Sequence, residues 1–266
     1  MKRVTAFVGT ATKKATYHAV RQFLDNLAAH GDVEVEIVRL SEYRLETCRG
    51  CRQCFSRGEE RCPLKDDRDA LIAKMMASDG VVFATPNYSF QVSAQLKLFL
   101  DRLGYAMHRP QFHGRTYTSI VIQGFFGARK IERYLNLVGT AVGFNTVKGS
   151  CITALDPMGE KEKHKLDRTL AQHGERFYAR LMAPAYPVPS LFSLFGFRMG
   201  RTTVRLELDE RDRDYQVYRD RGWLESDYYY PTHLGPVKRA FGRLIEKLVA
   251  RKYGKNRTTP ATSEAV

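Results

Sequence analysis

The feature that most restricts the fold is the alternation of strand-like and helix-like segments along residues 3–182. Because parallel strands need crossover helices, this alternation predicts an α/β fold with a doubly wound, five-stranded parallel sheet in the order 2-1-3-4-5. Short β-branched and aromatic runs predict strands at Arg3–Val8, Val33–Leu40, Gly80–Ala84, Thr116–Gln123 and Thr146–Ala154. Apolar residues three and four positions apart predict helices at Thr16–Ala29, Asp69–Ala77, Ala94–Leu103, Ala128–Val142 and Glu160–Met182.

In such a sheet a ligand binds at the carboxyl ends of strands one and three. The loops that follow these two strands are Gly9–Thr16 and Thr85–Ser93, and we expect them to meet there. The first loop carries hydroxyls at Thr10, Thr12 and Thr16 just before a helix. A helix N-terminus attracts anions, so these threonines suit a phosphate group; alternatively, Thr16 only caps the helix.

The composition changes after Ala183, where Pro184, Pro187 and Pro189 end the helical pattern. We expect a main domain over residues 1–183, a helical C-terminal extension over residues 184–257 and a disordered tail at residues 258–266. The extension is expected to lack a core of its own and to pack on the main domain or on a second subunit. Trp223 and the tyrosines at 228–230 either cover a ligand or a dimer contact, or simply fix the extension in place.

Hydrophobic residues at 43% and charged residues at 27% of the 266-residue chain are typical of a globular protein. No apolar run is long enough for a transmembrane segment, and the N-terminus leads directly into a strand, so a cytoplasmic location is predicted. The net charge is +14, and residues 232–257 hold eight basic residues and one acidic residue.

The basic segment near the C-terminus has apolar residues at helical spacing: Val237, Phe241, Leu244 and Leu248. Docking on nucleic acid or on a membrane surface is one interpretation. We favour packing of the apolar face on the protein, with the basic face in solvent. No nucleic-acid partner is therefore expected, and peripheral membrane contact is the less favoured alternative.

Four of the five cysteines fall within fifteen positions: Cys48, Cys51, Cys54 and Cys62. In a reducing compartment such a cluster is better explained by metal or redox chemistry than by disulfides. The spacing leaves open an iron-sulfur cluster, a zinc ion or free redox-active thiols. Cys151 lies alone on a predicted strand and is interpreted as a small core residue.

The stretch from Thr85 to Arg102 resembles the Thr-Pro-x-Tyr-x4-Ser-x2-Leu-Lys-x-Phe-x-Asp-Arg segment of the NAD(P)H-dependent FMN reductases and related flavodoxin-like flavoproteins. The resemblance covers residues 1–183 and includes the cysteine loop running into Asp66 and Asp67. It implies an FMN site in which the first loop binds the phosphate and the later loops contact the ring. The implied phosphate ligands are Thr10, Thr12 and Thr16, and the implied ring contacts are Pro86, Asn87, Tyr88, Ser89, Phe90, Gly124 and Phe125.

The cysteine run also resembles the compact motif with which iron-sulfur flavoproteins ligate a [4Fe-4S] cluster near FMN. That resemblance implies Cys48, Cys51, Cys54 and Cys62 as metal ligands, beside the zinc and free-thiol alternatives.

The leading hypothesis is therefore an FMN-dependent enzyme that takes a hydride from NAD(P)H and reduces a quinone, a flavin or another small acceptor. The second is an iron-sulfur flavoprotein that passes electrons to a protein partner. The third, of another class, is a protein that binds nucleic acid or a membrane surface through its basic tail. The flavin itself would carry the redox chemistry, so no catalytic side chain is assigned. The resemblance further implies a homodimer or larger oligomer.

Overall fold

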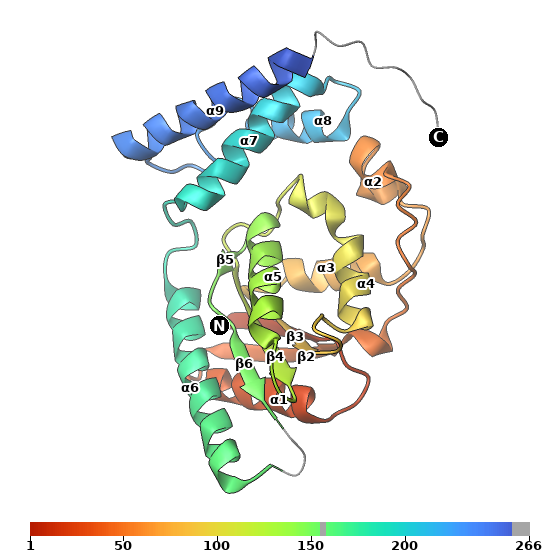
Figure 1. Ribbon diagram of the computed structural model, residues 1–266, viewed down its shortest axis with the longest axis vertical. Helices are drawn as coiled ribbons and strands as arrows, with labels where there is room; N and C mark the ends of the chain where they lie inside the picture. Colours follow the sequence, from red (N-terminus) through yellow and green to blue (C-terminus); the bar gives the residue numbers. More distant parts are fainter. Residues whose placement is uncertain (155–157, 257–266) are drawn as a thin grey trace. The chain divides into compact units, whose positions relative to one another are not determined.

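The computed structural model describes residues 1–154 and 158–256 and contains one parallel sheet (Figure 1). The strands run in the order β2-β1-β3-β4-β5, and β6 also pairs with β4. The strand bounds are β1 Lys2–Val8, β2 Val33–Arg39, β3 Gly80–Pro86, β4 Thr116–Gln123, β5 Asn145–Thr146 and β6 Ser150–Thr153. This topology confirms the predicted flavodoxin-like, doubly wound sheet.

Helices connect the strands and continue beyond the sheet. Those between and directly after the strands are α1 Ala15–Ala28, α2 Gln53–Ser56, α3 Arg68–Met76, α4 Ala94–Arg102, α5 Ala128–Ala141 and α6 Glu160–Met182. Three more follow, namely α7 Leu191–Glu207, α8 Arg213–Asp220 and α9 Pro236–Asn256. Short 3₁₀ turns lie at Leu40–Glu42, Glu59–Arg61 and Gly104–Met107. No helix among the described residues has both the length and the apolar character needed to span a bilayer.

The chain forms two compact units. The first unit comprises residues 1–51 and 63–185, and the second comprises residues 52–62 together with the chain from Tyr186 onward. The short helix α2 thus belongs with the C-terminal helices, where it contacts α8. The predicted tail at 258–266 lies outside the described residues.

In the first unit, helices cover both faces of the sheet, as alternation of side chains along the strands requires. Val4, Ala6 and Val8 of β1 face a core shared with α1 and α6. Phe7, between them, points to the opposite face and stacks on Phe99 of α4 with ring centroids 5.8 Å apart. The helices α3, α4 and α5 lie on that second face (Figure 1). Because all the strands are parallel, their carboxyl ends lie at the same edge of the sheet. The loops after β1, β3 and β4 are therefore neighbours at this edge.

The fifth strand departs from the prediction, because the expected single strand at 146–154 is divided into β5 and β6. Tyr117 of β4 is paired with Thr146, whereas Ile120 is paired with Ser150, so the fifth strand carries one extra residue between the two pairs. The bulge is accommodated at Gly149, whose N–H donates to Glu132 Oε1 at 2.9 Å. A bulge of this kind bends the strand and interrupts the ladder.

Tyr117 gives a test of the core packing. Its hydroxyl is buried and has no hydrogen-bond partner among the described residues. An unsatisfied buried hydroxyl is costly, so Tyr117→Phe is expected to leave the free energy of unfolding unchanged or to raise it by about 1 kcal/mol. Urea denaturation of the two proteins measures this difference. A loss of more than about 1 kcal/mol would mean that the hydroxyl has a partner in solution.

The second unit has a core of its own, so the expectation that the extension lacks one is wrong. The buried residues of this core are Leu194, Phe197, Val204, Tyr218, Trp223, Leu224, Tyr228 and Leu234. Trp223 Nε1 donates to the carbonyl of Tyr229 at 2.9 Å, which satisfies the indole within the core. Trp223 and the neighbouring tyrosines thus act as packing residues of this unit.

Candidate functional site

The first loop, residues 9–14, leaves the carboxyl end of β1 and leads into α1. Gly9 occupies a position where no side chain fits, because an added Cβ would lie 2.6 Å from Ser93 Oγ and 2.8 Å from Leu96 Cβ. Its N–H donates to the carbonyl of Ala84 at 2.8 Å. The first loop therefore packs directly on the end of β3 and the start of α4, as expected at a topological switch point.

The predicted phosphate ligands Thr10, Thr12 and Thr16 lie on this loop and in the first turn of α1. Thr10 and Thr16 are buried and Thr12 is exposed, with its N–H donating to Thr10 Oγ1 at 3.4 Å. Lys14 is the N-cap of α1, and its side chain makes no capping hydrogen bond. The alternative of Thr16 as the cap is therefore wrong, and the uncapped N–H groups of α1 are suited to an anion.

The second loop carries the predicted ring contacts in one continuous run after β3: Pro86, Asn87, Tyr88, Ser89 and Phe90. Tyr88 and Gln91 exchange two backbone hydrogen bonds, of 3.1 and 2.9 Å, and so close a two-residue turn. Its central residues Ser89 and Phe90 have φ of 49° and 64°. Two successive positive φ values are typical of a type I′ turn, which favours Asn and Gly. Non-glycine residues in this conformation store strain, and such strain concentrates at functional sites.

The third loop, Gly124–Gly127, contacts the second. Asn87 Nδ2 donates to the carbonyl of Phe126 at 2.8 Å, and the rings of Phe90 and Phe126 lie 5.3 Å apart. Of the predicted residues, Gly124 and Phe125 are both exposed at the end of β4, with Phe125 80% exposed. Sequence reasoning missed Phe126, although the Phe-Phe-Gly triplet after a buried strand could have indicated it.

Together the second and third loops present a surface suited to a flat ligand with a polar edge. Tyr88, Phe90, Phe125 and Phe126 are all exposed at this edge of the sheet, where apolar groups are not protected from water. Asn87 Oδ1 is buried, and no donor among the described residues reaches it. Clustered exposed aromatics and an unsatisfied acceptor both indicate a missing partner. A tricyclic ring with N–H groups on one edge has the chemistry to supply it.

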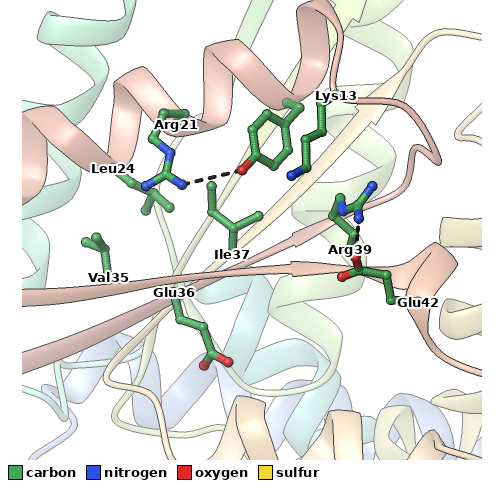
Figure 2. Close-up of a pocket in the computed structure, with 9 residues that line it drawn as sticks. Lys13, Arg21, Leu24, Val35, Glu36, Ile37, Arg39 and Glu42 are labelled. Atoms are coloured by element: carbon green, nitrogen blue, oxygen red, sulfur yellow. Dashed lines mark hydrogen bonds and ion pairs between the residues drawn. The ribbon is translucent and has the colours of Figure 1, made fainter.

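A cavity of about 380 Å³ adjoins the first loop on the α1 side of β2 (Figure 2). Leu24, Val35 and Ile37 give it apolar walls, and Figure 2 shows that Glu36 points away from them. Lys13, Arg21 and Arg39 line it with positive charge. Arg39 also donates to the carbonyl of Ala11 at 3.2 Å, so the end of β2 holds the first loop in place.

The two ends of the cysteine loop are held together within the first unit by hydrogen bonds and an ion pair. The residues that make these contacts are here called the neck: Arg44, Glu46, Asp66, Asp67 and Arg102. Asp66 Oδ2 accepts the N–H of Glu46 at 2.7 Å, and the carboxylate of Asp66 forms an ion pair with Arg102 of α4. Arg102 Nη1 also donates to the carbonyl of Glu46 at 3.0 Å. Asp67 Oδ2 accepts the N–H of Arg44 at 2.7 Å. The neck thus fixes both ends of the loop to the helix that follows the second loop.

The hydrogen bonds and the charge of Arg102 set the ionisation of Asp66. Burial by itself raises the pKa of this carboxyl, but the Arg102 guanidinium and the backbone N–H groups of Glu46 and Arg68 outweigh it. The pKa of Asp66 therefore lies below its ordinary value, and the side chain is an anion at neutral pH.

The four clustered cysteines are divided between the two units. Cys48 and Cys51 are exposed residues of the first unit, and Cys54 and Cys62 are partly buried residues of the second. Across the described ranges, no three Cys, His, Asp or Glu side chains form a group that could hold a metal ion. The four metal ligands implied by the resemblance therefore remain a prediction.

Comparison with known proteins places the chain in a family. Residues 2–155 match the family described as NADPH-dependent FMN reductase. An iron-sulfur flavoprotein of Archaeoglobus fulgidus is 32% identical over 213 residues, which cover 72% of this chain and 86% of that protein.

Solved structures share the fold. RosB with a bound 8-demethyl-8-formylriboflavin-5′-phosphate intermediate superposes with a TM-score of 0.55 at 12% identity, covering 100% of this chain and 95% of that chain. The NAD(P)H:quinone oxidoreductase of Methanothermobacter marburgensis gives 0.53 at 16% identity, over 65% of this chain and 97% of that chain. At these identities the likeness concerns the fold alone. On the family match and the related sequence, the chain belongs to the NADPH-dependent FMN reductase family and is an FMN-dependent oxidoreductase.

Proposed function

We propose that this chain binds FMN at the three loops and uses it to move electrons from NADH or NADPH to a small acceptor such as a quinone or a second flavin. The observation that carries the proposal is the contact of the second and third loops, which leaves exposed aromatic rings around the buried acceptor Asn87 Oδ1. Bound FMN would supply the redox chemistry, accepting a hydride from the nicotinamide and then yielding two electrons to the acceptor.

The residues of the chain would bind and orient the cofactor. The hydroxyls of Thr10, Thr12 and Thr16, with the uncapped N-terminus of α1, would hold the phosphate. The segment from Pro86 to Phe90 would lie along the ring, with Gly124 and Phe125 of the third loop beside it. The buried oxygen of Asn87 would accept from an N–H of the polar edge of the ring.

The direct test is titration of the purified protein with FMN, followed by steady-state assays. We expect saturable quenching of flavin fluorescence, then oxidation of NADH or NADPH that depends on an added quinone. Protein that neither retains nor takes up FMN would refute the flavin site. Protein that binds FMN but oxidises neither nucleotide, with any acceptor, would refute the electron donor.

Phe90 provides a test of the ring contact. Removal of one aromatic contact costs about 1 kcal/mol, so Phe90→Ala should weaken FMN binding about fivefold. Thermal stability of the FMN-free protein should change little, because the side chain is 56% exposed. Leu137→Ala on α5 is the matched control, since Leu137 is 52% exposed and lies outside the three loops. Equal FMN affinity in both variants would mean that the flavin ring does not contact Phe90.

A second candidate function is favoured by one observation: four cysteines in a compact loop occur in a chain 32% identical to a protein named as an iron-sulfur flavoprotein. Anaerobic purification followed by iron and acid-labile sulfide assays tests it. Stoichiometric iron that is lost in Cys48→Ser and kept in Cys151→Ser would support a cluster. Metal-free protein with an intact flavin would leave the first proposal standing and remove the second.

A further inference from the structure

The surface of α9 combines an apolar row with a basic row. Val237, Leu244 and Leu248 are 76%, 52% and 51% exposed and lie on one side of the helix. The expectation that this face packs on the protein is therefore wrong for these three residues. The buried positions of α9 include Gly242 and Ile245, which lie on a different side.

The neighbouring helix α7 carries a second exposed apolar row. The two helices pack against each other within the second unit. The exposed apolar residues of α7 are Leu191, Phe192, Phe195 and Met199. These four residues, together with Val237, Leu244 and Leu248 of α9, are here called the α7/α9 surface. An exposed apolar set of this size on one unit marks an interaction site.

Basic side chains run directly beside this surface. Arg243, Lys247 and Arg251 are exposed and follow each other at four-residue spacing, one position before Leu244, Leu248 and Lys252 in the chain. The acidic residue of α9, Glu246, is turned toward α7, where its carboxylate pairs with Arg198 and Arg201. The outward-facing part of α9 is therefore strongly positive.

The positive charge beside the α7/α9 surface indicates which kind of partner this surface binds. A symmetric contact between two copies would place the row formed by Arg243, Lys247 and Arg251 close to its own copy, and like charges repel. A nucleic acid would satisfy the cations but would leave the aliphatic side chains without a partner, because nucleic-acid sites use stacking and polar contacts. An anionic bilayer meets both needs, since its headgroups attract the cations and its acyl boundary takes up the apolar side chains.

We propose that the α7/α9 surface docks this protein on an anionic lipid bilayer, with the helices in the interface and none crossing it. The contact is peripheral and independent of the flavin site. It should weaken as salt is raised, because part of the attraction is between exposed charges and lipid headgroups.

Sedimentation of the FMN-loaded full chain with vesicles tests the proposal. Binding to vesicles of phosphatidylcholine mixed with phosphatidylglycerol should exceed binding to phosphatidylcholine alone by at least about tenfold. The double variant Leu244→Glu with Leu248→Glu should lose at least about tenfold in binding at low salt. Leu137→Glu, an exposed leucine of the first unit, is the matched control and should bind like the unchanged protein.

A second variant separates the basic row from the apolar one. Arg243→Gln with Lys247→Gln should reduce vesicle binding and flatten its salt dependence, whereas Leu244→Glu with Leu248→Glu should reduce vesicle binding at every salt concentration. FMN content and far-UV circular dichroism verify that each variant is folded.

Three outcomes would overturn the proposal. One is equal or absent sedimentation with both vesicle types. Another is a dimer in light scattering that the Leu244→Glu and Leu248→Glu variant converts to monomer, which would assign the surface to a second copy. The third is tight binding of RNA or DNA that is insensitive to the leucine substitutions and accompanied by no vesicle binding.

Discussion

Replacement of Asp66 by alanine is expected to lower the free energy of unfolding by about 3–5 kcal/mol. The side chains of Asp66 and Arg102 are 0% and 2% exposed, so the substitution would remove a buried carboxylate that forms an ion pair with a buried guanidinium. It would also remove the acceptor for the N–H groups of Glu46 and Arg68. Urea denaturation of the variant and the unchanged protein measures the loss.

The control is the neighbouring ion pair of α4, Lys97 with Asp101, which is about half exposed. Asp101→Ala should cost no more than about 0.5 kcal/mol, as surface pairs do. Asp66→Leu combined with Arg102→Met should recover part of the loss, because no charge then remains buried. If Asp66→Ala and Asp101→Ala cost the same, the pair is solvated in solution and the neck is not a stabilising element.

The neck also predicts a local effect on the cysteine loop. Because Asp66 joins Glu46 to Arg102, its loss should loosen the loop before the whole domain unfolds. Trypsin should then cleave faster after the loop arginines Arg49, Arg52, Arg57 and Arg61. Unchanged cleavage in a destabilised variant would show that the loop is held by other contacts.

The pH dependence follows from the lowered pKa of Asp66. A carboxyl whose pKa is lower in the folded state contributes stability above its unfolded pKa of about 3.9 and loses it as the pH falls through the folded value. Below about pH 4 the unchanged protein should therefore lose stability more steeply than Asp66→Asn. If the stability of the two proteins fell equally with pH, Asp66 would not be the source of the acid sensitivity.

The order of the sheet could be predicted from the sequence because it depends on local patterns. Buried parallel strands appear as short apolar runs, and the helices between them have their own spacing, so their alternation identifies the topology. The division of the fifth strand could not be predicted, since it depends on a contact between Gly149 and Glu132, seventeen positions apart in the chain. Periodicity carries no information about such a contact.

Some features of the candidate site could also be predicted from the sequence, and others could not. The resemblance identified the residues after β3, and the structure brings them against the third loop through Asn87 and Phe126. The neck was not predicted as a pair, because Asp66 and Arg102 are thirty-six positions apart. The core of the second unit was missed because its aromatic residues follow no regular spacing, and packing of this kind emerges only in three dimensions.

His173 of α6 should make the stability of the first unit depend on pH between 6.5 and 4.5. The ring is fully buried between Thr118 of β4 and Ser150 of β6, at 2.7 and 2.9 Å from their hydroxyls. Burial, with a smaller contribution from the charge of Arg176, lowers the pKa of His173 to about 3. The imidazole is therefore neutral in the folded protein and joins α6 to the two strands that end at the third loop and at Thr153.

The direction in which stability changes with pH follows from the linkage between protonation and folding. The folded pKa is below the unfolded value, so the stability is fully present above about pH 6.5 and falls as the unfolded chain takes up a proton that the folded chain cannot. Two pH units correspond to about 3 kcal/mol. Carboxyl groups whose pKa is lowered on folding, such as Glu36 and Glu246, contribute only toward the lower end of this range, and they contribute equally in variants of His173. Denaturation at pH 7 and 4.5 should therefore show a loss of about 3 kcal/mol.

His173→Gln identifies the source of this loss. Glutamine keeps a donor and an acceptor but does not titrate, so the variant should be less stable at pH 7 and should change little between pH 7 and 4.5. His30→Gln is the control, because His30 is exposed and stacks on Tyr178 with centroids 3.7 Å apart. The His30→Gln variant should lose as much stability between pH 7 and 4.5 as the unchanged protein. If His173→Gln kept the same loss of stability between pH 7 and 4.5, the loss would come from other titrating groups, and the assignment to His173 would be wrong.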